Sequence, residues 1–222
     1  MEKFKILEIK ANIFEDNKKE ADILRDELKE KRTFLLNLMS SPGSGKTTTL
    51  RRTIANLKDE YRIGIMEADI DSDVDARTIE ETGAKVIQLH TGGMCHLDCA
   101  MTRQGLEGLG IDELDLVVLE NIGNLVCPAE FDTGATKNAM ILSVPEGDDK
   151  PLKYPLMFQI CDALLINKID VLPYFEFDIE ECTKRARKLN PNIKVFPVSS
   201  RTGEGFDAWL NWLREEANKN VR

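Results

Sequence analysis

The first apolar run of the chain leads into a glycine-rich segment with the sequence SSPGSGKT at residues 40–47. Glycines let backbone N–H groups turn toward an anion, and the start of the helix expected next adds positive dipole potential. Lys46 can reach terminal phosphates, and the hydroxyl of Thr47 can ligate Mg²⁺. The segment predicts a phosphate-binding loop with contacts from Gly43, Ser44, Gly45, Lys46, Thr47 and Thr48.

The glycine pattern of this loop is incomplete, because Ser40 stands where the strict pattern has glycine. A bare glycine turn between a strand and a helix is the alternative interpretation. The sequence GSGKT, with an apolar run before it and a helical pattern after it, favours phosphate binding over that alternative.

A second motif, NKID at residues 167–170, lies at the end of another apolar run. It resembles the NKxD guanine motif of GTPases, in which Asp170 would accept both guanine N–H donors, Lys168 would pack across the ring and Asn167 would brace the loops. An isolated match of this kind is more often a surface turn. About thirty residues later, however, VSSRTG at residues 198–203 resembles the second guanine loop. The expected base contacts are Asn167, Lys168, Asp170 and Ser200, and adenine would leave the carboxylate poorly paired.

Acidic side chains follow two further apolar runs. Glu120 precedes Asn-Ile-Gly where Ras-like GTPases carry Asp-x-x-Gly, and a carboxylate there can hold the Mg²⁺ shell. In the acidic segment at residues 67–75 we favour Asp69 and Asp75 as magnesium-linked residues. Asp71 and Asp73 fit better as caps of a helix expected at residues 73–81. The expected magnesium set is Thr47, Asp69, Asp75 and Glu120, and the expected catalytic set is Lys46, Thr47 and Glu120.

Hydrolysis is expected to be slow without a partner. The segment at residues 120–123 has no glutamine that could orient an attacking water, and no arginine of the chain is an obvious finger in cis. Both groups accelerate phosphoryl transfer where they are present.

The cysteines and one histidine form a third constellation. Cys95 and His96 follow the third apolar run, Cys127 follows the fourth, and the three offer soft ligands for Ni²⁺ or Zn²⁺. Three ligands leave a tetrahedral site open, so two copies could share a metal across a two-fold axis. The alternative is that these are ordinary buried cysteines. Cys161 and Cys182 are expected in the core, and Cys99 is undecided.

The elements that must position these residues alternate between apolar runs and amphipathic stretches. This pattern predicts an α/β fold, with a mainly parallel sheet flanked by helices. Residues 1–32 are expected to be a helical extension and residues 33–222 a P-loop GTPase domain, in which residues 145–155 form a mobile loop. The expected strands are residues 34–39, 62–67, 85–89, 116–120, 139–144, 163–167 and 194–198, and the expected helices are 14–32, 47–60, 73–81, 96–109, 179–189 and 206–218.

Composition excludes several classes of protein. The 222 residues carry a formal net charge of -9, which argues against nonspecific binding to nucleic acid or to anionic membranes. No segment approaches the ~20 apolar residues that span a bilayer, and residues 1–10 lack the apolar run of a signal peptide. Five cysteines, an odd number, fit reduced thiols better than a disulfide framework. We therefore expect a cytoplasmic protein.

Five segments together resemble the HypB-type hydrogenase nickel-incorporation GTPases, from about Thr33 to the C-terminus: SSPGSGKTTT, TGGMCHLD, ENIGNLVCPAEFDTG, EGDDKPLKYP and NKID. The resemblance implies a SIMIBI-like GTPase that forms a homodimer when GTP is bound. Cys95, His96 and Cys127 would fall on its shared nickel or zinc site, and Lys150 or Lys153 would reach phosphates or acids of the partner. The implied partners are a hydrogenase large-subunit precursor and other hydrogenase maturation proteins.

The resemblance has departures and rivals. Cys99 replaces the family's usual alanine, and Gly93-Met94 replaces its more common Lys-Gly pair, so metal preference could differ. A urease-type or cobalamin-chaperone GTPase would share the fold, but urease relatives carry Cys-Pro-His in place of Cys-His-Leu-Asp. A regulatory GTPase with structural zinc would bind its metal without regard to the nucleotide.

Overall fold

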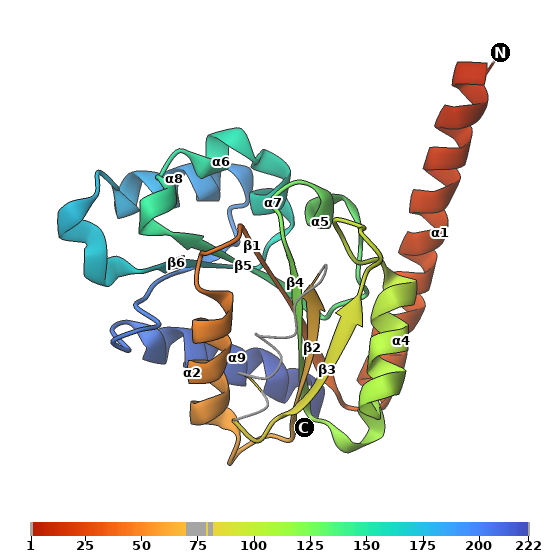
Figure 1. Cartoon of the computed structure of the whole chain (residues 1–222), viewed down its shortest axis with the longest axis horizontal. Helices are drawn as coiled ribbons and strands as arrows, with labels where there is room; N and C mark the ends of the chain where they lie inside the picture. Colours follow the sequence, from red (N-terminus) through yellow and green to blue (C-terminus); the bar gives the residue numbers. More distant parts are fainter. Residues whose placement is uncertain (1, 70–78, 80–81, 222) are drawn as a thin grey trace.

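The structure is a computed structural model that describes residues 2–69, 79 and 82–221 of the chain, with side chains from Asp16 onward apart from those of Asp69 and Val221. Within this part of the chain, seven strands form one sheet in the order β3-β2-β4-β1-β5-β6-β7, and every pair is parallel (Figure 1). The strands are β1 Phe34–Ser40, β2 Ile63–Asp69, β3 Lys85–His90, β4 Leu116–Gly123, β5 Lys137–Ser143, β6 Ala163–Asn167 and β7 Lys194–Pro197.

Helices cover both faces of the sheet. The described helices are α1 Glu2–Glu30, α2 Lys46–Leu57, α4 Cys99–Leu109, η1 Ile111–Glu113, α5 Cys127–Glu130, η2 Val144–Glu146, α6 Lys150–Lys153, α7 Pro155–Ile160, η3 Ile169–Tyr174, α8 Ile179–Leu189 and α9 Phe206–Val221. On one face, α2 and α9 bury side chains such as Ile54 and Trp209 against β1. On the other face, α1 and α4 pack beside α5, α7 and α8. The expected α/β fold is confirmed.

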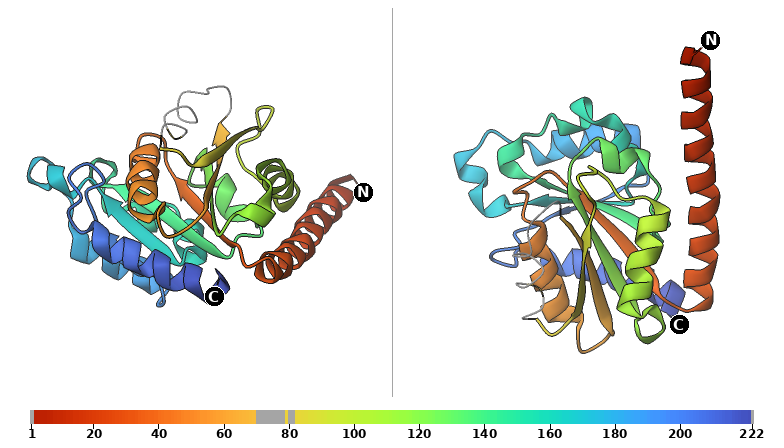
Figure 2. Two further views of the ribbon diagram at one scale, coloured as in Figure 1. Left: turned by 90° about the horizontal axis from the view of Figure 1, so that it is seen from below. Right: turned by 45° about the vertical axis from the view of Figure 1, so that its right-hand side comes forward.

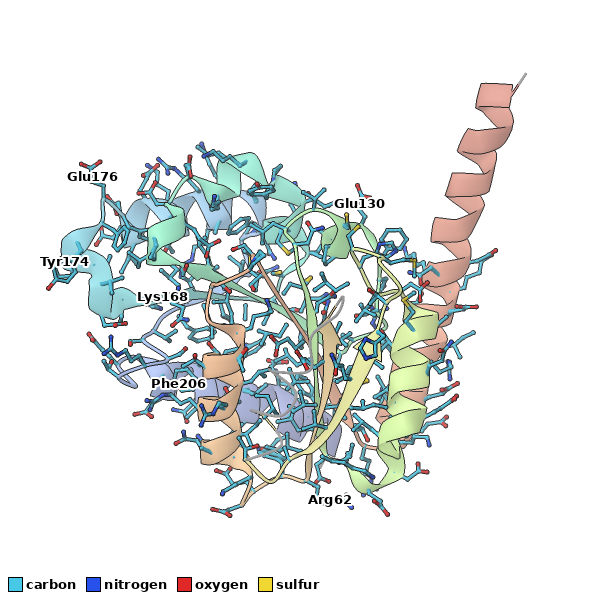
Figure 3. The ribbon with its side chains drawn as sticks, in the orientation of Figure 1. Arg62, Glu130, Lys168, Tyr174, Glu176 and Phe206 are labelled. Atoms are coloured by element: carbon cyan, nitrogen blue, oxygen red, sulfur yellow. The ribbon has the colours of Figure 1, made fainter. Side chains whose placement is uncertain are left out.

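Parallel pairing places the carboxyl ends of all strands along one edge of the sheet. The loops after β1, β3, β4, β6 and β7, which carry the motifs found in the sequence, therefore emerge on the same side. Figure 3 shows Glu130, at the end of α5, far from Arg62, which precedes β2 at the opposite edge.

Several elements differ from the sequence-based expectations, and the short helices α5 and α7 were not expected at all. The first helix is longer, and the N-terminal half of α1 stands clear of the sheet (Figure 2). Helix α4 begins at Cys99 and not at His96, because the carboxylate of Asp98 caps it by accepting from the Met101 N–H. The segment at residues 145–155 contains η2 and α6 where a mobile loop was expected. The helix expected at residues 73–81 lies outside the described residues except for Ile79.

Helix α1 buries a narrow apolar stripe. Ala21, Leu24 and Leu28 are each at most 2% exposed and pack in one cluster with α4. The proposed division of the chain between residues 32 and 33 stays a prediction. Among the described helices, none combines the length and apolar character needed to cross a bilayer.

A charged pair at the amino ends of β2 and β4 yields a pH-dependent prediction. The Asp115 carboxylate accepts hydrogen bonds from the Arg62 backbone N, Nε and Nη2 at 2.9, 3.0 and 2.7 Å. The Arg62 guanidinium lowers the pKa of Asp115 from its ordinary value. A carboxyl group whose pKa is lower in the folded than in the unfolded state stabilises the fold at pH values above the unfolded pKa. This contribution is lost as the pH falls through the folded pKa.

Asp115→Asn should therefore lower the Tm by a few degrees at pH 7, and the difference from wild type should shrink below about pH 4. Circular dichroism melts at pH 7, 5 and 3.5 measure this, with the exposed Asp59→Asn as the control. A Tm difference that stays constant down to pH 3.5 would contradict the pairing.

Candidate functional site

The phosphate-binding loop has the backbone geometry that its glycines predict. Gly43 and Gly45 have φ values of 73° and 101°, in the left-handed region, and α2 begins directly after Gly45. A Cβ atom at Gly45 would lie 2.6 Å from Asn167 Nδ2, so glycine is required there by contact as well as by conformation. Lys46 Nζ donates to Ser40 Oγ at 3.1 Å. The serine that departs from the strict pattern therefore holds the loop lysine in place.

The NKID segment forms hydrogen bonds with this loop. Asn167 Nδ2 donates to the Ser44 carbonyl at 2.9 Å, and Asn167 Oδ1 accepts from the Ser200 N–H at 3.0 Å. Lys168 Nζ donates to the Gly43 carbonyl at 2.6 Å. One buried amide thus joins the phosphate loop to both segments expected to contact the base.

The second guanine segment holds the carboxylate expected to read the base. Ser199 Oγ donates to Asp170 Oδ1 at 2.6 Å, which fixes the orientation of that carboxylate. Ser200 Oγ lies 2.7 Å from Thr49 Oγ1 on α2. The structure therefore brings the predicted residues of all three motifs together at one edge of the sheet.

Arg52 is a residue of this region that sequence reasoning missed. Its Nε and Nη2 donate to the Ser200 and Arg201 carbonyls at 2.7 and 2.8 Å. The guanidinium also lies 5.7 Å from the ring centroid of Phe206, which is labelled in Figure 3. Arg52 ties the phosphate-loop helix to the second guanine segment, and no local sequence signal distinguishes it from the adjacent Arg51.

Two buried carboxylates lie side by side near the phosphate loop. Glu120 pairs in register with Glu67 on β2 and with Leu38 on β1, and the glutamates are 3% and 2% exposed. Val118 and Ile65 precede Glu120 and Glu67 by two residues, and both are buried against α2. Because alternate side chains of a strand share a face, both carboxylates face α2 as well. Buried carboxylates need a cation or hydrogen-bond donors, and oxygen ligands suit Mg²⁺. Glu67 was missed as a candidate ligand. The Asp69 side chain and Asp75 lie outside the described residues.

The thiols of Cys95 and Cys127 meet in the loops after β3 and β4. The Cys95 Sγ donates to the Cys127 Sγ at 2.8 Å, and His96 Nδ1 lies 3.9 Å from the Cys95 Sγ. The hydrogen bond with Cys127 raises the pKa of the Cys95 thiol. Burial lowers the pKa of His96, which leaves its imidazole neutral with a lone pair for a metal. The His96 ring stacks on Phe131, with centroids 3.6 Å apart.

The remaining cysteines belong to the core. Cys99, Cys161 and Cys182 are all fully buried, and burial raises the pKa of each thiol, that of Cys99 to about 11. This agrees with the expectation for Cys161 and Cys182, and it places Cys99 in the core on α4. Across the residues that the structure describes, no group of three or more metal-binding side chains is assembled within one chain.

Most of the chain matches the model of a known protein family. The model of the "CobW/HypB/UreG, nucleotide-binding domain" matches residues 34–197. The chain belongs to the CobW/HypB/UreG family. The hydrogenase maturation factor HypB of Escherichia coli K12 is 43% identical over 216 residues, covering 97% of this chain and 74% of the relative. The probable HypB of Methanocaldococcus jannaschii is 39% identical over 217 residues and covers 98% of each chain.

Solved structures place the chain within the HypB branch of this family. HypB from Helicobacter pylori, determined in complex with nickel, superposes with a TM-score of 0.86 at 36% identity, covering 93% of this chain and 97% of that one. HypB from Archaeoglobus fulgidus gives 0.85 at 36% identity, covering 91% and 98%. The signal recognition particle receptor FtsY of Elizabethkingia anophelis shares the fold alone, with a TM-score of 0.54 at 13% identity and coverage of 79% and 64%. The expected family and the SIMIBI-like fold are confirmed.

Proposed function

We propose that this chain is a GTP-hydrolysing metallochaperone that assists nickel insertion into a [NiFe]-hydrogenase precursor. The observation that carries the proposal is the Cys95–Cys127 thiol pair, which lies at the same sheet edge as the phosphate loop. The relatives named hydrogenase maturation factors and the nickel complex of the H. pylori protein support it. The partners are the hydrogenase large-subunit precursor and other maturation proteins, and the site of action is the cytoplasm.

The nucleotide site follows from the three motifs. Backbone N–H groups from Gly43 to Thr48 surround the phosphates, Lys46 neutralises their developing charge, and Asp170 selects guanine. The Mg²⁺ cofactor would be held by Thr47 and Glu120, together with Asp69 and Asp75, and would supply further positive charge at the phosphates. Because the segment at residues 120–123 contains no glutamine to orient a water, intrinsic hydrolysis is slow.

Metal binding depends on GTP through a homodimer. Cys95, His96 and Cys127 supply three soft ligands, and a second copy completes the coordination. Met94 and Val126, in the loops on this edge, and Leu152, on α6, are 39%, 51% and 66% exposed, and they offer apolar contacts to that copy. If GTP and nickel both favour the dimer, each tightens binding of the other by the same factor.

Cys127→Ala is expected to weaken Ni²⁺ binding at least about 100-fold, because it removes a ligand and not merely a supporting group. Ni²⁺ affinity and molecular mass are measured together, with a nonhydrolysable GTP analogue and then with GDP. The matched control is Cys182→Ala on α8, which removes a thiol of the core and leaves Cys95 and Cys127 intact. Wild type should form a dimer and bind Ni²⁺ more tightly in the GTP state.

Two outcomes would overturn the proposal. Equal Ni²⁺ affinity in both nucleotide states would point to a GTPase with a structural metal site. Wild-type affinity in Cys127→Ala would leave the cysteines without a role in metal binding.

A further inference from the structure

One side chain of α1 contacts both chain segments that carry the thiol pair. Asn17 Nδ2 donates to the Asp132 carbonyl at 2.9 Å, and Asn17 Oδ1 accepts from the Cys99 N–H at 3.0 Å. Cys99 lies four residues after Cys95, and Asp132 lies five residues after Cys127. A single amide therefore links the two loops that must meet for Cys95, His96 and Cys127 to act together.

Both contacts satisfy main-chain groups, one at the start of α4 and one in the segment between α5 and β5. The Cys99 N–H belongs to the first residue of α4. The carboxylate of Asp98 accepts from a different N–H of this first turn, that of Met101. Helix ends leave several N–H groups without intrahelical partners, and Asn17 accepts one of them. An asparagine side chain carries an acceptor and a donor at once, so it can bridge an N–H and a carbonyl where aspartate or alanine cannot.

Helix α1 is a fixed support for this bridge. Eight residues after Asn17, Arg25 Nε donates to the Ala135 carbonyl at 3.0 Å and its Nη2 pairs with the Asp132 carboxylate. Leu24 packs so closely that a Cβ atom on Gly134 would lie 2.7 Å from its Cδ2. Charge, main-chain and apolar contacts all hold α1 against the segment that follows α5.

The same segment also orients the imidazole. Phe131, the residue before Asp132, stacks on His96 at an interplanar angle of 11°. A shift of Asp132 away from α1 would move Phe131 and with it the support of the His96 ring. The two loops are thus coupled at the Asn17 bridge and again at the ring stack.

We propose that Asn17 is a positioning residue for the metal site. It holds the loop from Cys95 to Cys99 and the segment from Cys127 to Asp132 at the spacing at which the Cys95 and Cys127 thiols meet, so that the docking of α1 sets metal affinity. The inference rests on the proposed function of this site. Because coupling is reciprocal, a bound metal should also tighten the docking of α1.

Asn17→Ala should weaken Ni²⁺ binding roughly tenfold, as loss of a group that supports metal ligands does. Alanine is a better helix former than asparagine, so loss of α1 itself is not the expected cause. Asn17→Asp keeps the acceptor for Cys99 but loses the donor to Asp132, and its affinity should be intermediate. Lys18→Ala, an exposed neighbour on the same helix, is the matched control and should bind like wild type.

Affinity is measured by titration with Ni²⁺ alone on the full chain, beside GTP affinity and hydrogen exchange of α1. GTP affinity should stay unchanged in Asn17→Ala, and added Ni²⁺ should slow exchange at residues 17–30 in wild type but not in the variant. Wild-type Ni²⁺ affinity in Asn17→Ala, with Cys127→Ala still impaired, would overturn this inference alone. Wild-type affinity in Cys127→Ala would overturn the proposed metal site itself.

Discussion

Asp170→Asn should change the base preference of the nucleotide site from guanine to xanthine. The carboxylate offers two acceptors, and one of its oxygens is already oriented by Ser199 Oγ at 2.6 Å. Guanine presents two N–H donors on the matching edge. An asparagine would place an N–H group against the exocyclic amine, whereas xanthine presents a carbonyl there and an N–H beside it. The substitution therefore sets two N–H donors against each other when guanine binds. When xanthine binds, it pairs each donor with an acceptor.

GTP affinity should fall at least about 10³-fold in Asp170→Asn, and XTP affinity should rise above that for GTP. Competition with a fluorescent nucleotide measures GTP, XTP and ATP on wild type and variant. The exposed Asp207→Asn on α9 is the matched control for loss of one negative charge. Retained GTP preference in Asp170→Asn would show that the base binds elsewhere.

The nucleotide motifs were predictable because each is a short continuous segment. In residues 43–47 the backbone conformations and the lysine are encoded within five positions. The structure places Gly43 and Gly45 between β1 and α2 and makes Lys46 the first residue of α2. Asn167 was expected to brace loops, and it does so through contacts to Ser44 and Ser200. Local spacing determines such sites, so they can be recognised without knowledge of strand order.

Other functional neighbours depend on pairing between distant segments. Glu67 lies beside Glu120 only because β2 pairs with β4, and nothing in the apolar runs specifies the order β3-β2-β4-β1. Arg52 and Asn17 act through carbonyls and N–H groups more than eighty residues away along the chain. Main-chain groups carry no sequence signal, so side chains that bind them are found only in the folded structure.

The start of α4 was predicted too early, at residue 96, although the sequence contained a signal for the correct start at Cys99. His96 was expected inside the helix, although Asp98 is a good N-cap and apolar positions with helical spacing begin after it. The later start leaves Cys95 and His96 in an irregular turn, where Cys95 can reach Cys127. A helix from residue 96 would have placed Cys99 one turn beyond Cys95 on a shared face, but Cys99 is buried in the core.

Lys46→Ala should remove most of the hydrolysis and all of the effect of GTP on metal binding. Lys46 is held by Ser40 at the start of the loop that is expected to surround the phosphates. Loss of a cation aimed at developing phosphate charge should reduce the rate about 10² to 10³-fold. The thiol pair lies in other loops, so Ni²⁺ affinity without nucleotide should be unchanged. Phosphate release and Ni²⁺ titration, with and without a nonhydrolysable GTP analogue, measure these effects.

Lys58→Ala, directly after α2, removes the same charge outside the phosphate loop and should behave like wild type in both assays. The pair of variants separates two origins of the nucleotide effect. If GTP acts through its phosphates on a dimer, Lys46→Ala has equal Ni²⁺ affinity with and without nucleotide. If Lys46→Ala still shows tighter Ni²⁺ binding at saturating analogue, the coupling comes from the base segments that Asn167 joins to the phosphate loop. Wild-type hydrolysis in Lys46→Ala would contradict the assignment of this lysine.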